Sequence, residues 1–133
     1  MRHNKIVTWI CRIVAAAIML QTLYFKFTGA DESIFIFSQV GMEPWGRYAA
    51  GIAELIASVL ILLPRTSVLG ALLALGIMAG ALATHLFVIG IEVANDGGLL
   101  FIYACLVMLA SGYIVYDQRE VLLTVIHKRR LTL

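Results

Sequence analysis

Charged side chains are scarce in this sequence. Only 14% of its 133 residues are Asp, Glu, Lys or Arg, and 62% are hydrophobic. An average soluble domain is about 25% charged and about 45–50% apolar. The apolar residues also form long blocks, which predicts an integral membrane protein. Because no polar linker is long enough to separate two domains, we expect residues 1–133 to form a single membrane domain.

Cysteine and histidine are equally sparse. The two cysteines, Cys11 and Cys105, are too few for a disulfide framework. Their predicted depths differ, which argues against a bridge, whose Cα atoms must lie within about 7 Å. The histidines, His3, His85 and His127, also lie at different depths, and no CxxC or HxxxH spacing occurs. The sequence therefore predicts no metal site.

Common enzymatic fingerprints are missing as well. The sequence has no nucleophile elbow, phosphate-binding loop or dinucleotide fingerprint. Most of its basic residues gather at the two ends, where they suit anionic lipid headgroups, and nothing resembles a nucleic-acid surface. We therefore predict the lipid bilayer as a partner, no nucleic acid and no evident cofactor, and we leave open whether the chain is an enzyme.

Four apolar segments are each long enough to cross a hydrocarbon core of about 30 Å, which takes about 20 helical residues. Pro44 is well placed for the first turn of the second segment, and Pro64 ends it. The first segment is too long for the core of a signal peptide, so we interpret it as an uncleaved helix. The predicted spans are residues 6–27, 45–63, 66–91 and 99–116.

A short apolar stretch separates the first two spans. Residues 34–37 read IFIF, which is too apolar for a free loop and too short to span a bilayer. Asp31 or Ser33 is a suitable cap, and Gly41 a suitable end, for a helix through Val40. We predict an interfacial or re-entrant helix here, and hence an all-α bundle of four transmembrane helices with one short extra helix.

The charges outside the spans predict the orientation. Both ends of the chain and the turn at Arg65 are basic, whereas the other two connections carry acidic residues. The positive-inside rule places both termini in the cytoplasm. The cytoplasmic tail, residues 117–133, is amphipathic, and two interpretations stay open: a helix on the inner membrane surface or a solvated end.

Glu54 is the polar residue that most needs an explanation, because it is the only charge in the run GIAELIASVLILLP. At 1.5 Å per residue it lies roughly 12–14 Å below the outer start of its span. Gln21, His85 and Tyr103 fall at about the same depth in the other three spans. We therefore expect Glu54 to point into the bundle, within a polar layer in its outer half.

The cations nearest to this layer are Lys26 and Arg47, whose long side chains can reach along a helix. We expect both cations to pair with Glu54. We expect His85 to be a hydrogen-bond partner of Glu54. Two interpretations follow: a pocket for a small ligand or proton, formed by Glu54, His85, Lys26, Arg47, Gln21 and Tyr103, or a network that only fixes helix register. For His85 taken alone, the second interpretation, a purely structural role, is favoured.

A GxxxG pattern, Gly76 and Gly80, lies on a different part of the third span from His85. Such a pair lets another helix backbone approach closely. The pattern also allows a homodimer through this face.

Several segments occur in an order that resembles a known family. They are LQTLYFKFTGA at the end of the first span, then GMEPWGR, GIAELIASVLILLPR and LGALLALGIMAGALATHL. The chain from about Leu20 to about Phe101 is similar to the DoxX family of small bacterial membrane proteins, specifically its DoxX-like members. The resemblance implies a four-helix bundle in the bacterial inner membrane, with Lys26, Glu54 and His85 at positions where the family keeps polar residues.

The family takes its name from a membrane subunit associated with a thiosulfate:quinone oxidoreductase. By this resemblance we expect an accessory subunit of a membrane redox system that binds a quinone-like molecule and has a membrane or periplasmic redox partner. The alternative is a non-enzymatic scaffold or an assembly or chaperone factor. The sequence has no redox-active cysteine pair, which argues against direct thiol–disulfide exchange.

Overall fold

The computed structural model describes residues 5–91, 97–120 and 123–124, and these residues form helices and turns with no strand. Four helical stretches are long and apolar enough to cross a membrane. In chain order the elements are α1 (Lys5–Thr28), α2 (Asp31–Gln39), α3 (Trp45–Leu62), α4 (Ser67–Thr84), the π-helical turn η1 (His85–Ile89) and α5 (Leu99–Asp117). The predicted four-helix membrane bundle is confirmed.

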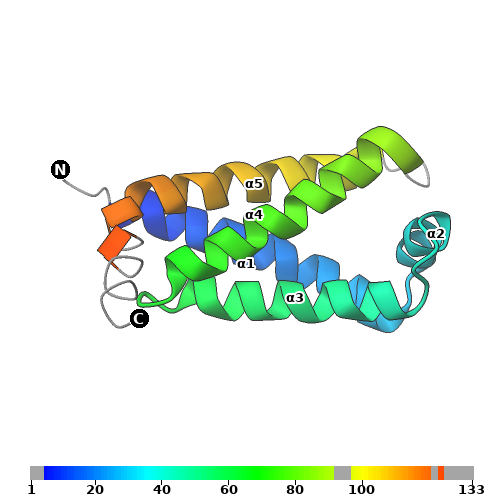
Figure 1. The fold of residues 1–133 in the computed structure, drawn as a ribbon, viewed down its shortest axis with the longest axis horizontal. Coiled ribbons are helices and arrows are strands. Elements are labelled where there is room, and N and C mark those ends of the chain that lie inside the picture. Colours follow the sequence, from blue (N-terminus) through cyan, green and yellow to red (C-terminus); the bar gives the residue numbers. More distant parts are fainter. Residues whose placement is uncertain (1–4, 92–96, 121–122, 125–133) are drawn as a thin grey trace.

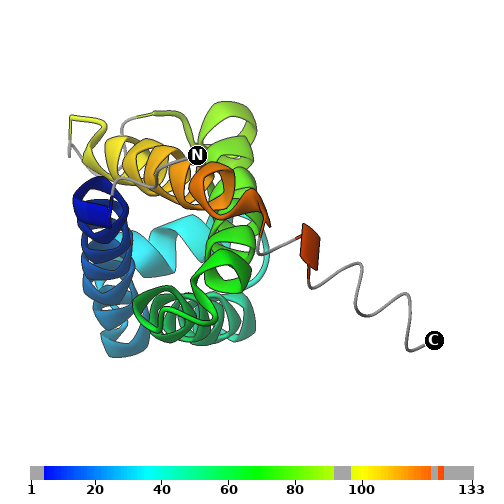
Figure 2. The same cartoon turned by 90° about the vertical axis from the view of Figure 1, so that its left-hand side faces the viewer.

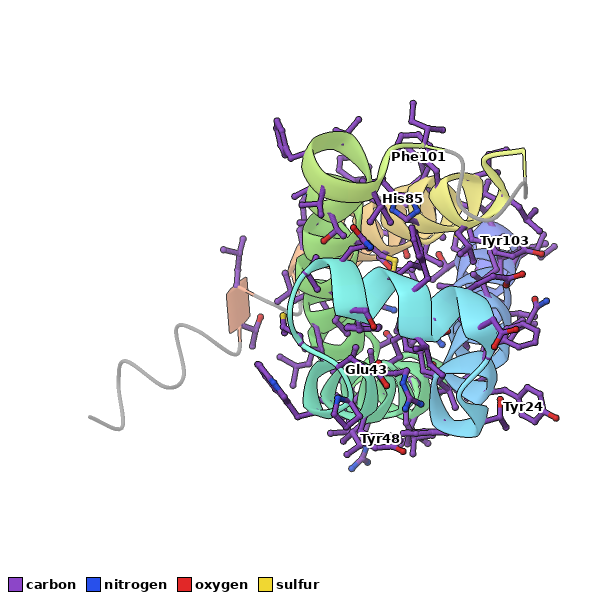
Figure 3. All side chains as sticks on the ribbon, turned by 90° about the vertical axis from the view of Figure 1, so that its right-hand side faces the viewer. Tyr24, Glu43, Tyr48, His85, Phe101 and Tyr103 are labelled. Carbon is purple, nitrogen blue, oxygen red and sulfur yellow. The ribbon has the colours of Figure 1, made fainter. Side chains whose placement is uncertain are left out.

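The long helices run antiparallel in a closed ring, in which α1 packs on α3, α3 on α4, α4 on α5 and α5 on α1 (Figures 1 and 2). The short helix α2 lies across one end of this ring (Figure 3). The start of α1, the α3–α4 turn and the end of α5 all lie at the opposite end (Figure 1). We call these the α2 end and the terminal end.

Proline and glycine set most of the helix boundaries, as the sequence predicts. Pro44 precedes α3 and Pro64 follows it, and Gly41, with φ of +74°, lies just after α2. The capping prediction for α2 is wrong: its N-cap is Ala30, and Asp31 is already in the first turn. An acidic side chain there stabilises the helix through the helix dipole instead.

The third predicted span is continuous but not uniform. Its last turn widens into η1 and ends at Gly90, which has φ of +84°. The predicted tail lies largely outside the described residues, which include 117–120 and 123–124 of it. The two interpretations of the tail therefore stay as predictions.

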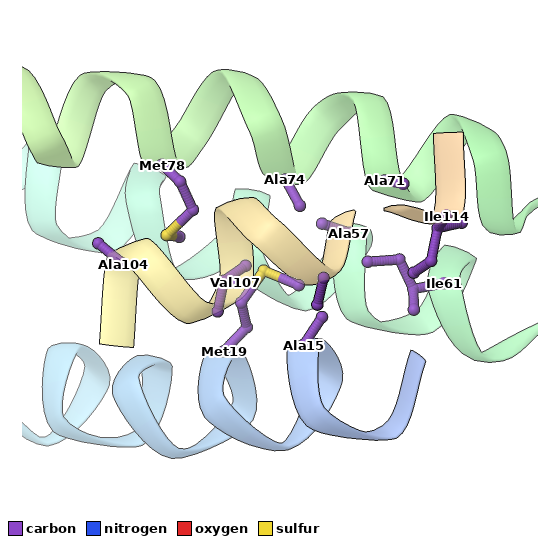
Figure 4. Close-up of a cluster of buried hydrophobic side chains, with 11 residues drawn as sticks. Ala15, Met19, Ala57, Ile61, Ala71, Ala74, Met78, Ala104, Val107 and Ile114 are labelled. Atoms are coloured by element: carbon purple, nitrogen blue, oxygen red, sulfur yellow. The ribbon is translucent and has the colours of Figure 1, made fainter. Parts of the chain in front are cut away.

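The core is built mainly from small side chains (Figure 4). Alanines from three helices are completely buried, which lets the helix backbones approach closely. Large apolar residues instead face outward: Phe87 is 84% exposed and Leu109 72%. This arrangement suits a bundle surrounded by lipid. The buried cluster is Ala15, Met19, Ala57, Ile61, Ala71, Ala74, Met78, Ala104, Val107, Ala110 and Ile114.

The closest approach of α3 and α4 occurs at Gly70. A Cβ atom at this position would lie 2.6 Å from the Ile61 backbone nitrogen and 2.8 Å from the Ala57 carbonyl oxygen. Backbone atoms cannot move aside as a flexible side chain can. Gly70 therefore fixes the point at which α3 and α4 cross.

We predict that Gly70→Ala destabilises the bundle by about 1–3 kcal/mol, the usual cost of overpacking. The matched control is Gly76→Ala on the same helix, where a Cβ has no atom within 4 Å. That change should be neutral or stabilising, because alanine favours a helix over glycine by about 0.5–1 kcal/mol. Thermal unfolding in detergent micelles measures both. Equal melting temperatures for the two variants would contradict the close crossing.

Candidate functional site

The carboxylate of Glu54 lies inside the bundle and forms an ion pair between two helices. Its side chain is 2% exposed, and Oε1 lies 2.6 Å from Nζ of Lys26. Glu54 is on α3 and Lys26 is in the last turn of α1, where the helix dipole also favours a cation. The predicted inward orientation of Glu54 and its pairing with Lys26 are therefore confirmed.

The second carboxylate oxygen has a partner that the sequence interpretation missed. The hydroxyl of Thr22 donates a hydrogen bond to Glu54 Oε2, and Thr22 lies one turn before Lys26 on α1. Spacing of i and i+4 places both side chains on the same face of a helix. The sequence feature that could have predicted this contact is the position of Thr22 four residues before Lys26.

Arg47 does not pair with Glu54, which corrects the sequence prediction. Its guanidinium contacts both carboxylate oxygens of Glu43, at 2.8–3.0 Å, one helical turn earlier in the chain. Its Nη1 donates to the backbone carbonyl of Lys26. Arg47 thus ties the carboxyl end of α1 to the start of α3 and positions the backbone that carries the Lys26 ammonium.

A cavity of about 530 Å³ lies beside the ion pair, beneath α2. Most of its lining is apolar and comes from all five α-helices. The polar or charged lining residues are Thr22, Lys26, Glu32, Ser33, Glu54, Thr84 and His85. The apolar lining includes Ile18, Met19, Phe25, Ile36, Phe37, Val40, Ile77, Met78, Leu100 and Ala104. A volume and lining of this kind are typical of small-molecule sites.

His85 lines this cavity, but it is not a hydrogen-bond partner of Glu54 as expected. Its Nδ1 lies 2.9 Å from the carbonyl oxygen of Ala81, one turn earlier on α4. A carbonyl only accepts, so Nδ1 carries the proton and Nε2 of the neutral ring is an acceptor. Nε2 is buried without a hydrogen-bond partner among the described residues, and the ring packs edge-on against Phe101 (Figure 3).

Gln21 and Tyr103 do not join the residues that line the cavity. Gln21 is exposed on α1, because it precedes Thr22 by one residue and so points about 100° away around the helix. Tyr103 is half-buried on α5, and Figure 3 shows it apart from His85. Of the six candidate residues, the structure brings Lys26, Glu54 and His85 to the cavity wall.

A second polar cluster lies at the terminal end, where the sequence interpretation expected only surface charge. Arg12 is 5% exposed, and its Nη2 donates to Ser67 Oγ at 3.1 Å. Ser67 donates to the side chain of Gln118 at 2.5 Å, and Thr8 donates to Asp117 at 2.7 Å. These bonds join α1, α4 and α5. Arg12 is therefore part of the helix packing and not a lipid-facing terminal charge.

The described residues contain no group of three or more His, Cys, Asp or Glu side chains that could hold a metal ion. Cys11 and Cys105 are both free thiols.

Comparison with known proteins agrees with this architecture. A family model described as the DoxX-like family matches residues 10–111, well over half of the chain. The chain belongs to the DoxX-like family. The matched region of this DoxX-like chain includes the ion pair, His85 and the whole of α2, α3 and α4. No curated protein and no solved structure shows a significant match to it.

The ion pair of the DoxX-like chain gives a quantitative prediction. Glu54→Gln and Lys26→Met each leave one buried charge without its partner, which costs about 3–5 kcal/mol in a buried pair. The double variant removes both charges of the pair, so its free energy of unfolding should fall by less than the sum of the two single losses. Unfolding of the four proteins in micelles measures the coupling. Strictly additive losses would contradict a direct interaction.

Proposed function

We propose that this DoxX-like chain is an accessory subunit of a redox system in the bacterial inner membrane, and that its cavity binds the head of a quinone-like molecule. The observation that carries the proposal is the buried Lys26–Glu54 pair in the wall of a mostly apolar cavity. Such a wall offers one oriented polar contact within a shape that suits an apolar ring.

The charge of the site favours an uncharged head. Lys26 and Glu54 neutralise each other, and the third charged lining residue, Glu32, is exposed, so an anionic or cationic ligand head beside the ion pair would bring an unpaired charge into a buried site. The Lys26 side chain is 17% exposed, compared with 2% for Glu54, and an ammonium has three N–H donors. Lys26 is therefore the group that donates a hydrogen bond to a ligand carbonyl, and Glu54 holds it in place.

His85 supplies the complementary contact. Its Nε2 is a buried acceptor without a partner among the described residues, and leaving such a group unsatisfied costs free energy. A hydroxyl on the ligand, such as that of the reduced quinol form, would satisfy it after a local side-chain adjustment. A head with an acceptor toward Lys26 and a donor toward His85 uses both polar walls of the cavity.

The orientation belongs to the same proposal. With both termini in the cytoplasm, the α2 end faces outward, and the cavity lies in the outer half of the bilayer. A membrane or periplasmic partner protein would carry out the electron transfer. The role of this chain is then to hold the head at a fixed depth.

We expect a short-chain quinone to raise the melting temperature of the purified protein, and the same compound without carbonyl groups to have no effect. The Lys26→Met/Glu54→Gln double variant should lose this response, because the donor to the carbonyl is gone. Arg65→Met, in the α3–α4 turn at the terminal end, is the control and should keep it. Native mass spectrometry of the purified protein provides an independent measurement of a co-purifying ligand.

Two outcomes would overturn the proposal. One is a wild-type protein with neither a quinone-dependent shift nor a co-purifying lipid-like ligand. The other is a double variant that retains both. If cross-linking then recovered a reproducible partner, the scaffold or assembly role would be the better account.

A further inference from the structure

The helices α3 and α4 diverge toward the α2 end (Figure 1). They touch at Gly70, where an added Cβ would meet the α3 backbone below 3 Å. Two and three turns further along α4, a Cβ at Gly76 or Gly80 would have no atom within 4 Å. The crossing at Gly70 therefore opens into a widening gap between the two helices.

The cavity reaches this gap. Five residues that line the cavity are also exposed on the surface: Ala49 from α3, Gly76 and Gly80 from α4, Phe25 from α1 and Glu32 from α2. A residue that both lines a cavity and is exposed marks an opening, so Phe25 and Glu32 mark one between α1 and α2, and the other three residues mark one between α3 and α4. The end of the bundle is covered by α2, from which Ser33 and Phe37 line the cavity. The mouth between α3 and α4 thus faces sideways.

This side of the bundle faces lipid. Both helices are candidate membrane spans, and α3 presents Ile52 and Ile56 to the exterior, 51% and 48% exposed. The rim itself carries no side chain larger than a methyl group at Ala49, Gly76 or Gly80. A slender apolar chain therefore fits between the helices where a bulky side chain would not.

We infer that the gap between α3 and α4 is a lateral portal that holds the hydrocarbon tail of a lipid whose uncharged polar head sits at Lys26 and Glu54. The inference rests on the proposed function for the head and adds the tail and the route of entry. A polar ion pair at the inner end and small apolar residues at the mouth match an amphipathic single-chain lipid. An isoprenoid quinone has this chemistry.

The test compares a long-chain quinone with its short-chain counterpart in lipid nanodiscs. In the wild-type protein the long-chain form should bind more tightly. In Gly80→Leu the new side chain occupies the portal, so the long-chain affinity should fall about tenfold, the effect of displacing roughly two buried methylene groups. Equilibrium affinity for the short-chain form should not change.

Ala79→Leu is the matched control, since Ala79 is exposed at the same depth of α4 but does not line the cavity. It should leave both affinities unchanged, and Gly76→Leu should repeat the effect of Gly80→Leu. An unchanged long-chain affinity in both glycine variants would overturn the portal, as would an equal loss for both quinones. Disulfide-linked dimers of Gly80→Cys would also overturn it, in favour of a second copy at this face.

The two proposals fail in different ways. If the short-chain quinone does not bind the wild-type protein, the proposed function fails. If it binds as tightly as the long-chain form, only the portal fails.

Discussion

A carboxylate within the hydrocarbon region is the constraint on which the rest of this structure depends. An unpaired charge there is costly, so Glu54 needs a partner from another helix at the same depth. Lys26 provides it at 2.6 Å, and Thr22 takes the second oxygen. Because the three residues belong to α1 and α3, their contacts fix how these two helices are rotated against each other. The same contacts place a polar wall beside a buried core that is built mainly from small apolar side chains.

The two ends of the bundle differ as a result. At the terminal end, Arg12 and Ser67 join α1 and α4, and the packing is closed. At the α2 end, the helices diverge around a cavity, and Arg47 secures the end of α1 through the Lys26 carbonyl. Two ion pairs, Lys26 with Glu54 and Arg47 with Glu43, lie at this end, and the acidic residues Asp31 and Glu32 of α2 are exposed. The outcome is a cavity with few polar lining residues, among which Lys26 and Glu54 hold each other in place.

The sequence predicts the helices well because hydrophobic length, proline and glycine act locally. It also predicts the Lys26–Glu54 pair, since an isolated acid in an apolar run requires a cation at a similar depth. It assigned Arg47 wrongly because Glu43, one turn away, is a nearer carboxylate. His85 likewise uses the carbonyl of its own helix. The cavity itself was beyond prediction in detail, because it depends on the angle at which α3 and α4 leave their crossing at Gly70.

The central claim is that Glu54 is an ionised partner of Lys26 inside the bundle. The most direct measurement is the infrared difference spectrum between the wild-type protein and Glu54→Gln in a lipid bilayer at neutral pH. The account predicts that the substitution removes the bands of an ionised carboxylate. Loss of a protonated carboxylic acid band would contradict it, because a neutral Glu54 would not form the ion pair that joins α1 to α3.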